Sequence, residues 1–221
     1  MDKIYTGIKK NMLKINEIYA SIQGESSYTG LPCVFIRLTG SNLRCSWCDT
    51  AYAFHEGKPL TIEETLEKVE TFDLPLVEIT GGEPLLQDDV YPLMEALLKK
   101  GYRVMLETGG ALPINKVPEK VIKILDIKCP GSGEDKNNHL ENLQWLSPQD
   151  EVKFVLLDRA DYEWSRDLLQ KISPSTQVLF SPVYDELDLK DLSQWILEDR
   201  LAVRLQTQLH KVIWSKDTLG V

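Results

Sequence analysis

Two cysteines, Cys45 and Cys48, form a Cys-x-x-Cys pair that runs directly into Asp49 and Thr50. Thiolates are soft ligands that suit iron and zinc, whereas carboxylate and hydroxyl oxygens suit harder cations such as Mg²⁺. Ser41 stands four residues before Cys45, where a third cysteine would complete a Cys-x3-Cys-x2-Cys loop. The stretch therefore predicts a metal-cluster loop in which one ligand has been changed.

The cysteine pair taken alone leaves other interpretations open, because it also fits half of a zinc site or a dithiol redox centre. The chain has no second pair of this kind, and its three histidines, His55, His139 and His210, are scattered, which disfavours zinc. A dithiol centre is expected to open a helix after a strand, but this pair follows a polar loop and precedes an aspartate, which disfavours the thiolate. Two half-buried structural cysteines in a turn fit the pair about as well as a metal does.

Length and composition limit the setting of this chemistry. With 221 residues, 43% of them hydrophobic, the chain is expected to form a single domain over residues 1–221. No apolar run reaches membrane-spanning length and residues 1–5 lack a signal peptide's apolar stretch, so we expect a cytoplasmic protein. In that reducing compartment, the four cysteines favour ligands or buried thiols over disulfides. A net charge of −9 argues against an extended nucleic-acid surface.

Strand-like and helix-like segments alternate along the chain, which is typical of a parallel sheet with crossover helices. The expected helices cover residues 61–72, 88–100, 160–172 and 189–199; Thr61 and Glu64 have capping-box spacing at the start of the first. The expected strands cover residues 33–38, 76–80, 103–107, 121–127, 151–156, 177–180 and 202–206. About six parallel strands are fewer than the eight of a closed barrel, so we predict an α/β fold, an open partial TIM-like barrel with outer helices.

Polar clusters follow the expected strands where the chain leaves the sheet. The cysteine loop follows the first strand, and Thr-Gly-Gly-Glu-Pro at 80–84 follows the second. Glu-Thr-Gly-Gly at 107–110 and Asp-Ile-Lys at 126–128 follow the next two. The carboxyl ends of parallel strands meet at one edge of a sheet, so we expect one pocket to collect all four clusters.

The cysteine loop at 41–48, followed by Gly-Gly-Glu-Pro at 81–84, resembles the radical S-adenosylmethionine superfamily. Within it, Ile-Gln-Gly-Glu at 22–25, Cys-Asp-Thr at 48–50, Glu-Thr-Gly at 107–109 and Gln-Leu-His-Lys at 208–211 resemble the 7-carboxy-7-deazaguanine synthase family. The motifs occur in the family's order and span nearly the whole chain. Together, these ordered motifs are far more specific than any one of them.

The resemblance implies an enzyme, a carbon–nitrogen lyase. It would convert 6-carboxy-5,6,7,8-tetrahydropterin to 7-carboxy-7-deazaguanine with loss of ammonia, a step of queuosine biosynthesis. The implied cofactors are a 4Fe–4S cluster on three cysteines, S-adenosylmethionine on its free iron, and Mg²⁺ on the substrate. The cluster would cleave S-adenosylmethionine to a deoxyadenosyl radical that takes a hydrogen atom from the pterin. The implied partners are this small-molecule pterin, a flavodoxin or ferredoxin as electron donor, and a second copy of the chain as a homodimer, with no nucleic acid and no membrane.

The resemblance also assigns site residues. For the metals they are Cys45 and Cys48, with Ser41 in place of the expected cysteine, and Thr50 for Mg²⁺, supported by Asp49. For S-adenosylmethionine they are Gly82, Glu83, Asp126, Ile127, Lys128, Ser181, Pro182, Val183 and Tyr184. For the substrate they are Ile22, Gln23, Gly24, Arg37, Thr80 and His210. No catalytic residue beyond the cofactors is implied.

Each assignment has a plainer alternative. Gly82 would let backbone approach the amino group of S-adenosylmethionine, but a double glycine is also common in a strand-to-helix turn. The planar guanidinium of Arg37 fits the pterin carboxylate, but it fits a plain salt bridge equally well. Asp49 and Thr50 also suit a turn or cap. His210 could approach the substrate or anchor the chain end.

Ser41 is the chain's departure from the family pattern, which has cysteine at this position. A serine hydroxyl has a much higher pKa than a thiol and is a harder ligand, so it should hold cluster iron weakly. Three explanations are open: Ser41 is an engineered substitution, Ser41 is a natural oxygen ligand, or Cys33 replaces the cysteine ligand that is missing at position 41. Cys33 lies at the opposite end of its strand, too far at about 3.3 Å per residue. We therefore expect a labile or three-iron cluster and poor activity.

Two other functions remain open on the sequence. A glycyl-radical activase shares the cluster loop and the partial barrel, but it lacks the Gln-Gly-Glu and Asp-Thr features of this chain. A non-catalytic homologue that binds S-adenosylmethionine would explain Ser41, which is its only support. Formation of 5′-deoxyadenosine with and without the carboxypterin separates these functions.

Overall fold

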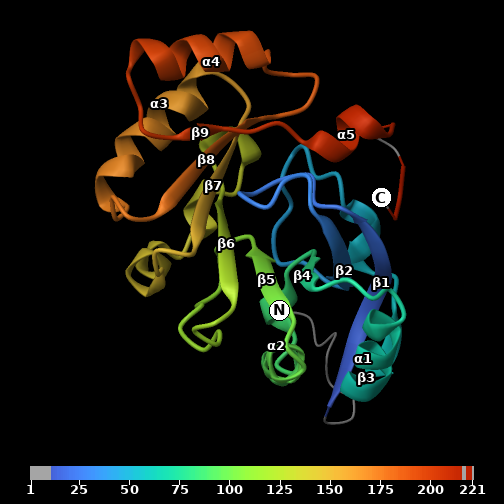
Figure 1. The fold of residues 1–221 in the computed structure, drawn as a ribbon. Coiled ribbons are helices and arrows are strands. Elements are labelled where there is room, and N and C mark those ends of the chain that lie inside the picture. The colour runs from blue at the N-terminus through green and yellow to red at the C-terminus, as the bar shows by residue number, and fades with distance from the viewer. Residues whose placement is uncertain (1–10, 216–217, 221) are drawn as a thin grey trace.

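A single nine-stranded sheet organises the molecule, and the computed structural model describes residues 11–215 and 218–220. The strand order is β3-β1-β2-β4-β5-β6-β7-β8-β9, and neighbours from β2 to β9 are parallel, whereas β1 runs antiparallel to β2 and β3 (Figure 1). The strands are β1 (Met12–Ile22), β2 (Pro32–Leu38), β3 (Lys58–Thr61), β4 (Leu76–Gly81), β5 (Arg103–Thr108), β6 (Ile122–Ile127), β7 (Glu151–Leu156), β8 (Gln177–Pro182) and β9 (Arg204–Leu205).

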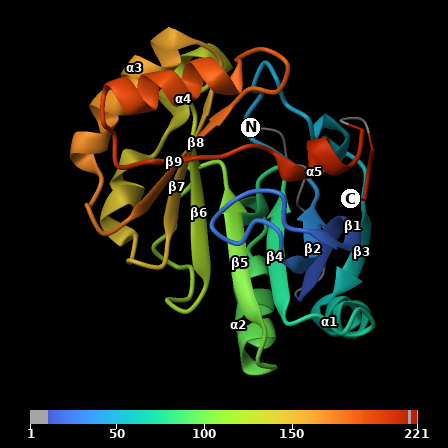
Figure 2. The same cartoon turned by 45° about the horizontal axis from the view of Figure 1, so that its top comes forward.

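The sheet is open, as predicted, because β3 and β9 are its two edges. Figure 2 shows the strands following one another across the molecule, with β1 and β3 at one end and β9 at the other. All of the expected parallel strands are present, although β9 is reduced to two residues. The antiparallel strands β1 and β3 were not predicted. Only Leu13 and Ile15 are buried in β1, so most of this strand has no buried apolar face.

Helices cover the outer face of the sheet. They are α1 (Ile62–Glu70), α2 (Val90–Lys99), α3 (Arg159–Leu168), α4 (Leu189–Glu198) and the short α5 (Leu209–Ile213). The capping box predicted at α1 is confirmed, since the Glu64 amide donates to Thr61 Oγ1 at 3.1 Å and the Thr61 amide donates to Glu64 Oε2 at 2.8 Å. Figure 1 shows α3 and α4 beside β7 to β9 and α1 beside β1 and β3. None of the described helices is long and apolar enough to cross a membrane.

The inner face of the sheet changes character along the strands. Near the amino ends of the parallel strands it is apolar, and its buried cluster is Cys33, Phe35, Leu76, Met105, Ile122 and Ile124. We call this cluster the apolar floor. Because side chains alternate between the faces of a strand, the next inward positions are two residues further on. They hold polar residues: Arg37, Glu78 and Thr80, Glu107, and Asp126. The fold therefore places a charged cavity above an apolar floor.

Candidate functional site

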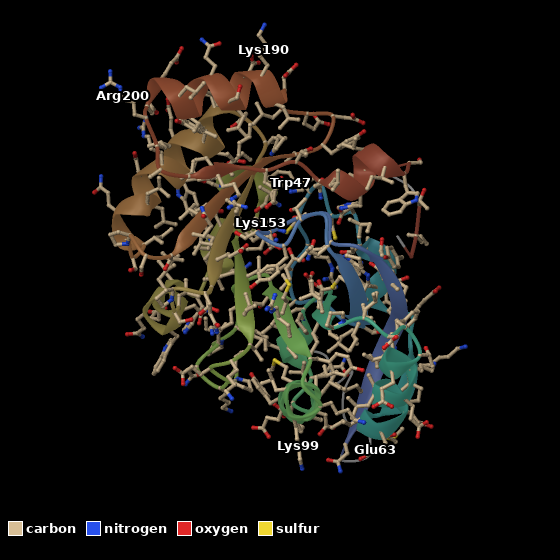
Figure 3. The ribbon with its side chains drawn as sticks, in the orientation of Figure 1. Trp47, Glu63, Lys99, Lys153, Lys190 and Arg200 are labelled. Atoms are coloured by element: carbon tan, nitrogen blue, oxygen red, sulfur yellow. The ribbon has the colours of Figure 1, made fainter. Side chains whose placement is uncertain are left out.

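A cavity of about 290 Å³ opens at the carboxyl ends of the strands. Its wall contains residues of the cysteine loop, the double glycine at the end of β4, the ends of β5 and β6, strand β7 and the C-terminal segment from Gln208 to Lys211. The expectation that one pocket collects the polar clusters is confirmed. It also contains Trp47 and Lys153, which lie near the centre of the molecule in Figure 3.

The cysteine loop presents Ser41, Cys45 and Cys48 to the cavity. The Cys48 amide donates to the Cys45 carbonyl at 3.2 Å, and this hydrogen bond closes a tight turn between the two cysteines. Ser41 Oγ lies 3.2 Å from both the amide nitrogen and the carbonyl oxygen of Leu43. Burial raises the pKa of the Cys45 thiol, and the nearby ammonium of Lys128 opposes that rise.

The double glycine at the end of β4 packs directly on the start of the cysteine loop. The Glu83 amide donates to the Gly40 carbonyl at 2.7 Å. A Cβ atom on Gly82 would overlap the Gly40 oxygen and lie 2.8 Å from Ser41 Cβ, so a side chain at position 82 would push the loop away. We call residues 81–83 the glycine ledge. It holds the position of Ser41 through backbone contacts, whatever side chain that residue carries.

The side chain of Glu83 anchors the glycine ledge on the side away from the cavity, which Glu83 does not border. Its buried carboxylate accepts hydrogen bonds from Thr108 Oγ1 at 2.8 Å, from the Gly109 amide at 2.8 Å and from the Leu85 amide at 3.0 Å. Burial raises the pKa of Glu83, and these hydrogen bonds oppose the rise. Glu83 thereby ties the end of β4 to the end of β5.

Neither of the other two cysteines borders the cavity. Cys33 belongs to the apolar floor, as its place at the start of β2 predicts. Cys129 lies in the loop after β6, where it is 1% exposed and its Sγ lies 3.3 Å from Ser165 Oγ beneath α3. Burial raises the pKa of both thiols.

Lys153 is the centre of a buried charge network that the sequence did not reveal. Its Nζ lies 2.8 Å from Glu25 Oε2 and 3.3 Å from Asp126 Oδ2, and it also contacts Glu107 Oε1. Lys128 Nζ adds a contact of 3.0 Å to Asp126 Oδ2. Burial opposes ionisation of Glu25 and Asp126, but these ammonium groups lower the pKa of both carboxyls. The sequence does contain one signal for this network. Lys153 lies among apolar residues of β7, at a position that faces the inner side of the sheet.

Arg37 lies in the cavity wall and is already oriented by two neighbours. Its Nε donates to Glu17 Oε1 at 2.8 Å and its Nη2 donates to Tyr19 Oη at 2.9 Å. Its Nη1 has no hydrogen-bond partner among residues 11–215 and 218–220. Both interpretations of Arg37 are therefore compatible, since a salt bridge on one side of the guanidinium leaves a donor on the other.

Gln23 and the segment after β1 form another part of the wall. Gln23 is 3% exposed; its Oε1 accepts from the Glu25 amide at 2.7 Å and its Nε2 donates to Glu78 Oε2. Ile22, Gly24 and Thr80 also border the cavity. The substrate residues expected from the sequence thus lie around one space.

The C-terminal segment lies across this wall. The Leu209 amide donates to the Gly24 carbonyl at 2.9 Å, and Gln208 Nε2 donates to Glu25 Oε1 at 2.9 Å. Lys211 Nζ lies 3.0 Å from Asp49 Oδ2, which joins the segment to the cysteine loop. His210 borders the cavity and packs against Gly24.

The residues expected to contact S-adenosylmethionine divide into two groups. Asp126, Lys128, Val183 and Tyr184 border the cavity together with Gly82, whereas Ile127, Ser181 and Pro182 are buried behind it. Within the part of the chain that the structure describes, Asp126 Oδ1 and Ser181 Oγ are buried without a hydrogen-bond partner. Buried polar atoms are rarely left unpaired, so these atoms, together with the glycine ledge, fit a polar ligand such as S-adenosylmethionine.

The donors for a cluster fit in position, with one change of chemistry. Cys45 and Cys48 supply two thiols and Ser41 supplies a hydroxyl, all bordering one cavity beside the glycine ledge. Soft thiolates suit iron–sulfur ligation, whereas an oxygen donor is harder. The loop can therefore hold a cluster with two sulfur ligands and one oxygen ligand.

Comparison with known proteins agrees with this arrangement. Residues 35–130 match the Radical SAM superfamily. The chain is 47% identical to a 7-carboxy-7-deazaguanine synthase from Koribacter versatilis, over 95% of this chain and 100% of the relative. It is 45% identical to another from Chlorobaculum tepidum, over 95% and 97%. The chain belongs to the 7-carboxy-7-deazaguanine synthase family.

A solved structure supports the fold of this synthase family. The crystal structure of QueE from Escherichia coli aligns with a TM-score of 0.75 and 23% identity, covering 90% of this chain and 95% of that chain. The prediction of an open, partial barrel is thereby confirmed. Membership also confirms the expectation of a lyase, and it implies S-adenosylmethionine and a 4Fe–4S cluster as cofactors. The glycyl-radical activase is not favoured.

Proposed function

We propose that this chain converts 6-carboxy-5,6,7,8-tetrahydropterin to 7-carboxy-7-deazaguanine with loss of ammonia, on the route to queuosine. One observation carries the proposal: the cluster loop, the glycine ledge and a charged substrate wall border a single cavity in a chain of this family. When bound, the cluster and S-adenosylmethionine supply a deoxyadenosyl radical to this cavity. The protein supplies position, charge and exclusion of water.

On the cofactor side, Cys45, Cys48 and Ser41 would hold the cluster, and the glycine ledge would receive the amino group of S-adenosylmethionine. Asp126 Oδ1, which is buried and unpaired within the described residues, is an acceptor for its hydroxyl or amino groups. Lys128 and Tyr184 border the same part of the cavity. Ile127, Ser181 and Pro182 would support these contacts from behind.

On the substrate side, Arg37 would bind the pterin carboxylate through its remaining donor, as a guanidinium suits a planar anion. Thr80 and His210 would contact the ring, beside the backbone of residues 22–24. The C-terminal segment would limit entry of water, because it bridges Glu25 on one side and Asp49 on the other.

Mg²⁺ is proposed as the cation that holds the substrate beside the cluster loop. Thr50 borders the cavity and would be its protein ligand, with Asp49 in support; oxygen donors of this kind suit Mg²⁺. Replacing Thr50 with valine keeps the shape and removes the hydroxyl. The expected result is a higher Mg²⁺ concentration for half-maximal turnover, and an unchanged Mg²⁺ requirement would contradict this assignment.

The function is tested by anaerobic reconstitution of the protein and of its Ser41→Cys variant, followed by incubation with the carboxypterin, S-adenosylmethionine and a reductant. The expected products are 7-carboxy-7-deazaguanine and ammonia in equal amounts, from the cysteine variant at least. If the variant makes 5′-deoxyadenosine in equal amounts with and without the carboxypterin, it catalyses another radical reaction. If neither protein makes it while both bind S-adenosylmethionine, the non-catalytic alternative that Ser41 suggests is correct.

The Arg37 assignment predicts a selective loss of binding. Arg37→Gln should weaken binding of 6-carboxypterin roughly 10- to 100-fold, the size of one charge-assisted hydrogen bond. Unsubstituted pterin, which lacks the carboxylate, should bind the wild type and the variant alike. Quenching of pterin fluorescence measures both ligands. The matched control is Arg200→Gln, because Arg200 follows α4 at the edge of the molecule in Figure 3. Equal weakening for both pterins would show that Arg37 acts only through Glu17 and Tyr19.

Several broader assignments are also proposals. We propose that the chain acts as one catalytic domain, since the single sheet joins strands from Met12 to Leu205. A flavodoxin or ferredoxin is proposed as electron donor, with a homodimer as the working assembly in the cytoplasm. Exposed apolar side chains on α5, Val212 and Ile213, are consistent with a contact between copies. Sedimentation of the wild type and of Val212→Asp tests the dimer, and turnover with each reduced carrier tests the donor.

A further inference from the structure

Glu78 is a buried carboxyl group in the cavity wall to which neither the sequence nor the family resemblance assigns a role. It lies on the inward face of β4, paired with Phe35 of β2 and Met105 of β5, which both belong to the apolar floor. It is 2% exposed and borders the cavity. The side chain therefore meets any ligand that reaches the deepest part of this space.

The hydrogen bonds of Glu78 leave one oxygen free. Gln23 Nε2 donates to Glu78 Oε2, and the other end of the Gln23 amide is fixed because its Oε1 accepts from the Glu25 amide at 2.7 Å. Glu78 Oε1 has no hydrogen-bond partner among residues 11–215 and 218–220. Gln23 thus fixes the orientation of the carboxyl group and leaves Oε1 for a ligand.

The carboxylates near Glu78 form ion pairs with a lysine, whereas Glu78 does not. Glu25, Glu107 and Asp126 all contact Lys153 Nζ. No lysine or arginine nitrogen of the described residues lies within ion-pair distance of Glu78. An ionised carboxylate that is buried without a cation is costly, whereas a protonated one needs only ordinary hydrogen bonds.

The groups that face Glu78 from the packed elements favour the same state. Burial is the main cause that raises the pKa of Glu78, and the charges of Glu107 on β5 and Glu25 after β1 raise it further. Lys153 on β7 and Arg37 on β2 oppose the rise without reversing it. The other titratable neighbours, Tyr19 on β1 and Cys33 on β2, are neutral at physiological pH because burial raises the pKa of each.

We propose that Glu78 is a neutral carboxylic acid whose O–H group donates a hydrogen bond to an acceptor atom of the bound pterin ring. This inference rests on the proposed function and adds a specificity-determining residue to it. A lactam ring offers carbonyl and imine-type acceptors along its edge, and the acid accepts from Gln23 through one oxygen while it donates through the other. An ionised carboxylate could not donate, and it would repel these acceptors.

Binding of 6-carboxypterin to the protein without its cluster tests the proposal, with fluorescence quenching measured across a pH series. Glu78→Gln is the key variant, because its amide accepts from Gln23 and donates into the cavity but does not titrate. We expect wild-type affinity to fall as pH rises through the raised pKa of Glu78. Glu78→Gln should lack that fall and bind within about threefold of the wild type at low pH. Glu78→Ala should bind roughly 3- to 10-fold more weakly there, the loss of one neutral hydrogen bond.

The wild type and Glu78→Gln bind the same ligand, so any titration of the pterin itself cancels when their pH curves are compared. Glu63→Gln, on the exposed part of α1 far from Lys153 in Figure 3, should behave as the wild type does. A binding curve with the same pH dependence in wild type and Glu78→Gln would overturn the inference and leave the proposed function standing. Absence of 6-carboxypterin binding at every pH would overturn both.

A second measurement needs no ligand. Because the pKa of Glu78 is raised in the folded state, its contribution to stability is complete below the ordinary glutamate pKa and is lost as pH rises through the folded value. Thermal unfolding should therefore show a stability loss over that range in the wild type and a smaller one in Glu78→Gln. Parallel stability curves would show that Glu78 is ionised, which also overturns the proposal.

Discussion

Replacing Ser41 with cysteine is expected to raise bound iron and sulfide to the full content of a 4Fe–4S cluster, whereas the wild type holds less and loses iron on gel filtration. The physical reason is that the substitution replaces an oxygen ligand with a sulfur ligand, while the backbone of residue 41 stays in the same position. The glycine ledge fixes residue 41 through the 2.7 Å hydrogen bond between the Glu83 amide and the Gly40 carbonyl. A thiolate at that position is a soft ligand, whereas the serine hydroxyl is hard and seldom ionised.

Iron and sulfide analysis after anaerobic reconstitution measures this effect, and electron paramagnetic resonance distinguishes a three-iron from a four-iron cluster. The matched control is Ser46→Cys, which adds a thiol to the same loop. Ser46 Oγ donates to the Gly131 carbonyl at 3.1 Å and does not border the cavity. It should leave the iron content unchanged. Equal cluster content and equal turnover in the wild type and Ser41→Cys would show that the oxygen ligand is fully adequate.

Replacing Lys153 with methionine is expected to destabilise the fold by about 3–5 kcal/mol at neutral pH, as removal of one member of a buried ion pair does. Three carboxylates, those of Glu25, Glu107 and Asp126, would lose their shared ammonium. Methionine keeps most of the volume of the side chain, so the loss is mainly electrostatic. Urea unfolding monitored by tryptophan fluorescence measures the change, with Lys99→Met on the exposed end of α2 as the control.

The effect of Lys153→Met should depend on pH in a defined direction. In the wild type the pKa values of Glu25 and Asp126 are lowered, so their ionisation adds stability above the ordinary carboxyl pKa, and this is lost as pH falls through the folded values. Without Lys153 the two pKa values rise. The deficit of the variant should therefore be largest near pH 7 and smaller near about pH 4, where the carboxyls take up protons. A deficit independent of pH would show that Lys153 acts through packing alone.

Most of the sheet was predictable, because buried parallel strands and amphipathic helices leave strong periodic signals. The segments that became β2, β4 to β8 and α1 to α4 all carry such signals. Strand β1 does not, since its residues beyond Ile15 are half-buried or exposed and a register shift interrupts it before Glu17. Helix α5 has five residues and no buried face of its own, and its position depends on contacts such as that between Leu209 and Gly24.

The candidate site was predictable where residues are adjacent in sequence. The cysteine loop and the glycine ledge are local motifs, and their side-by-side packing follows from parallel strands. Lys153 and Glu78 lie inside strands, so their role depends on which face of the sheet is inward, and that is decided by tertiary packing. The burial of Cys129 could not be predicted for the same reason, since a loop can be covered by a helix such as α3 that comes later in the chain.

The apolar floor limits how deep in the cavity a ligand can bind. Cys33, Phe35, Met105 and their neighbours close the amino-terminal end of the barrel. Glu78 precedes Gly81 by three residues, which is about 10 Å along a strand, so it lies deeper than the glycine ledge. A ligand that reaches Glu78 therefore lies at the closed end of the cavity, deeper than the level of the glycine ledge.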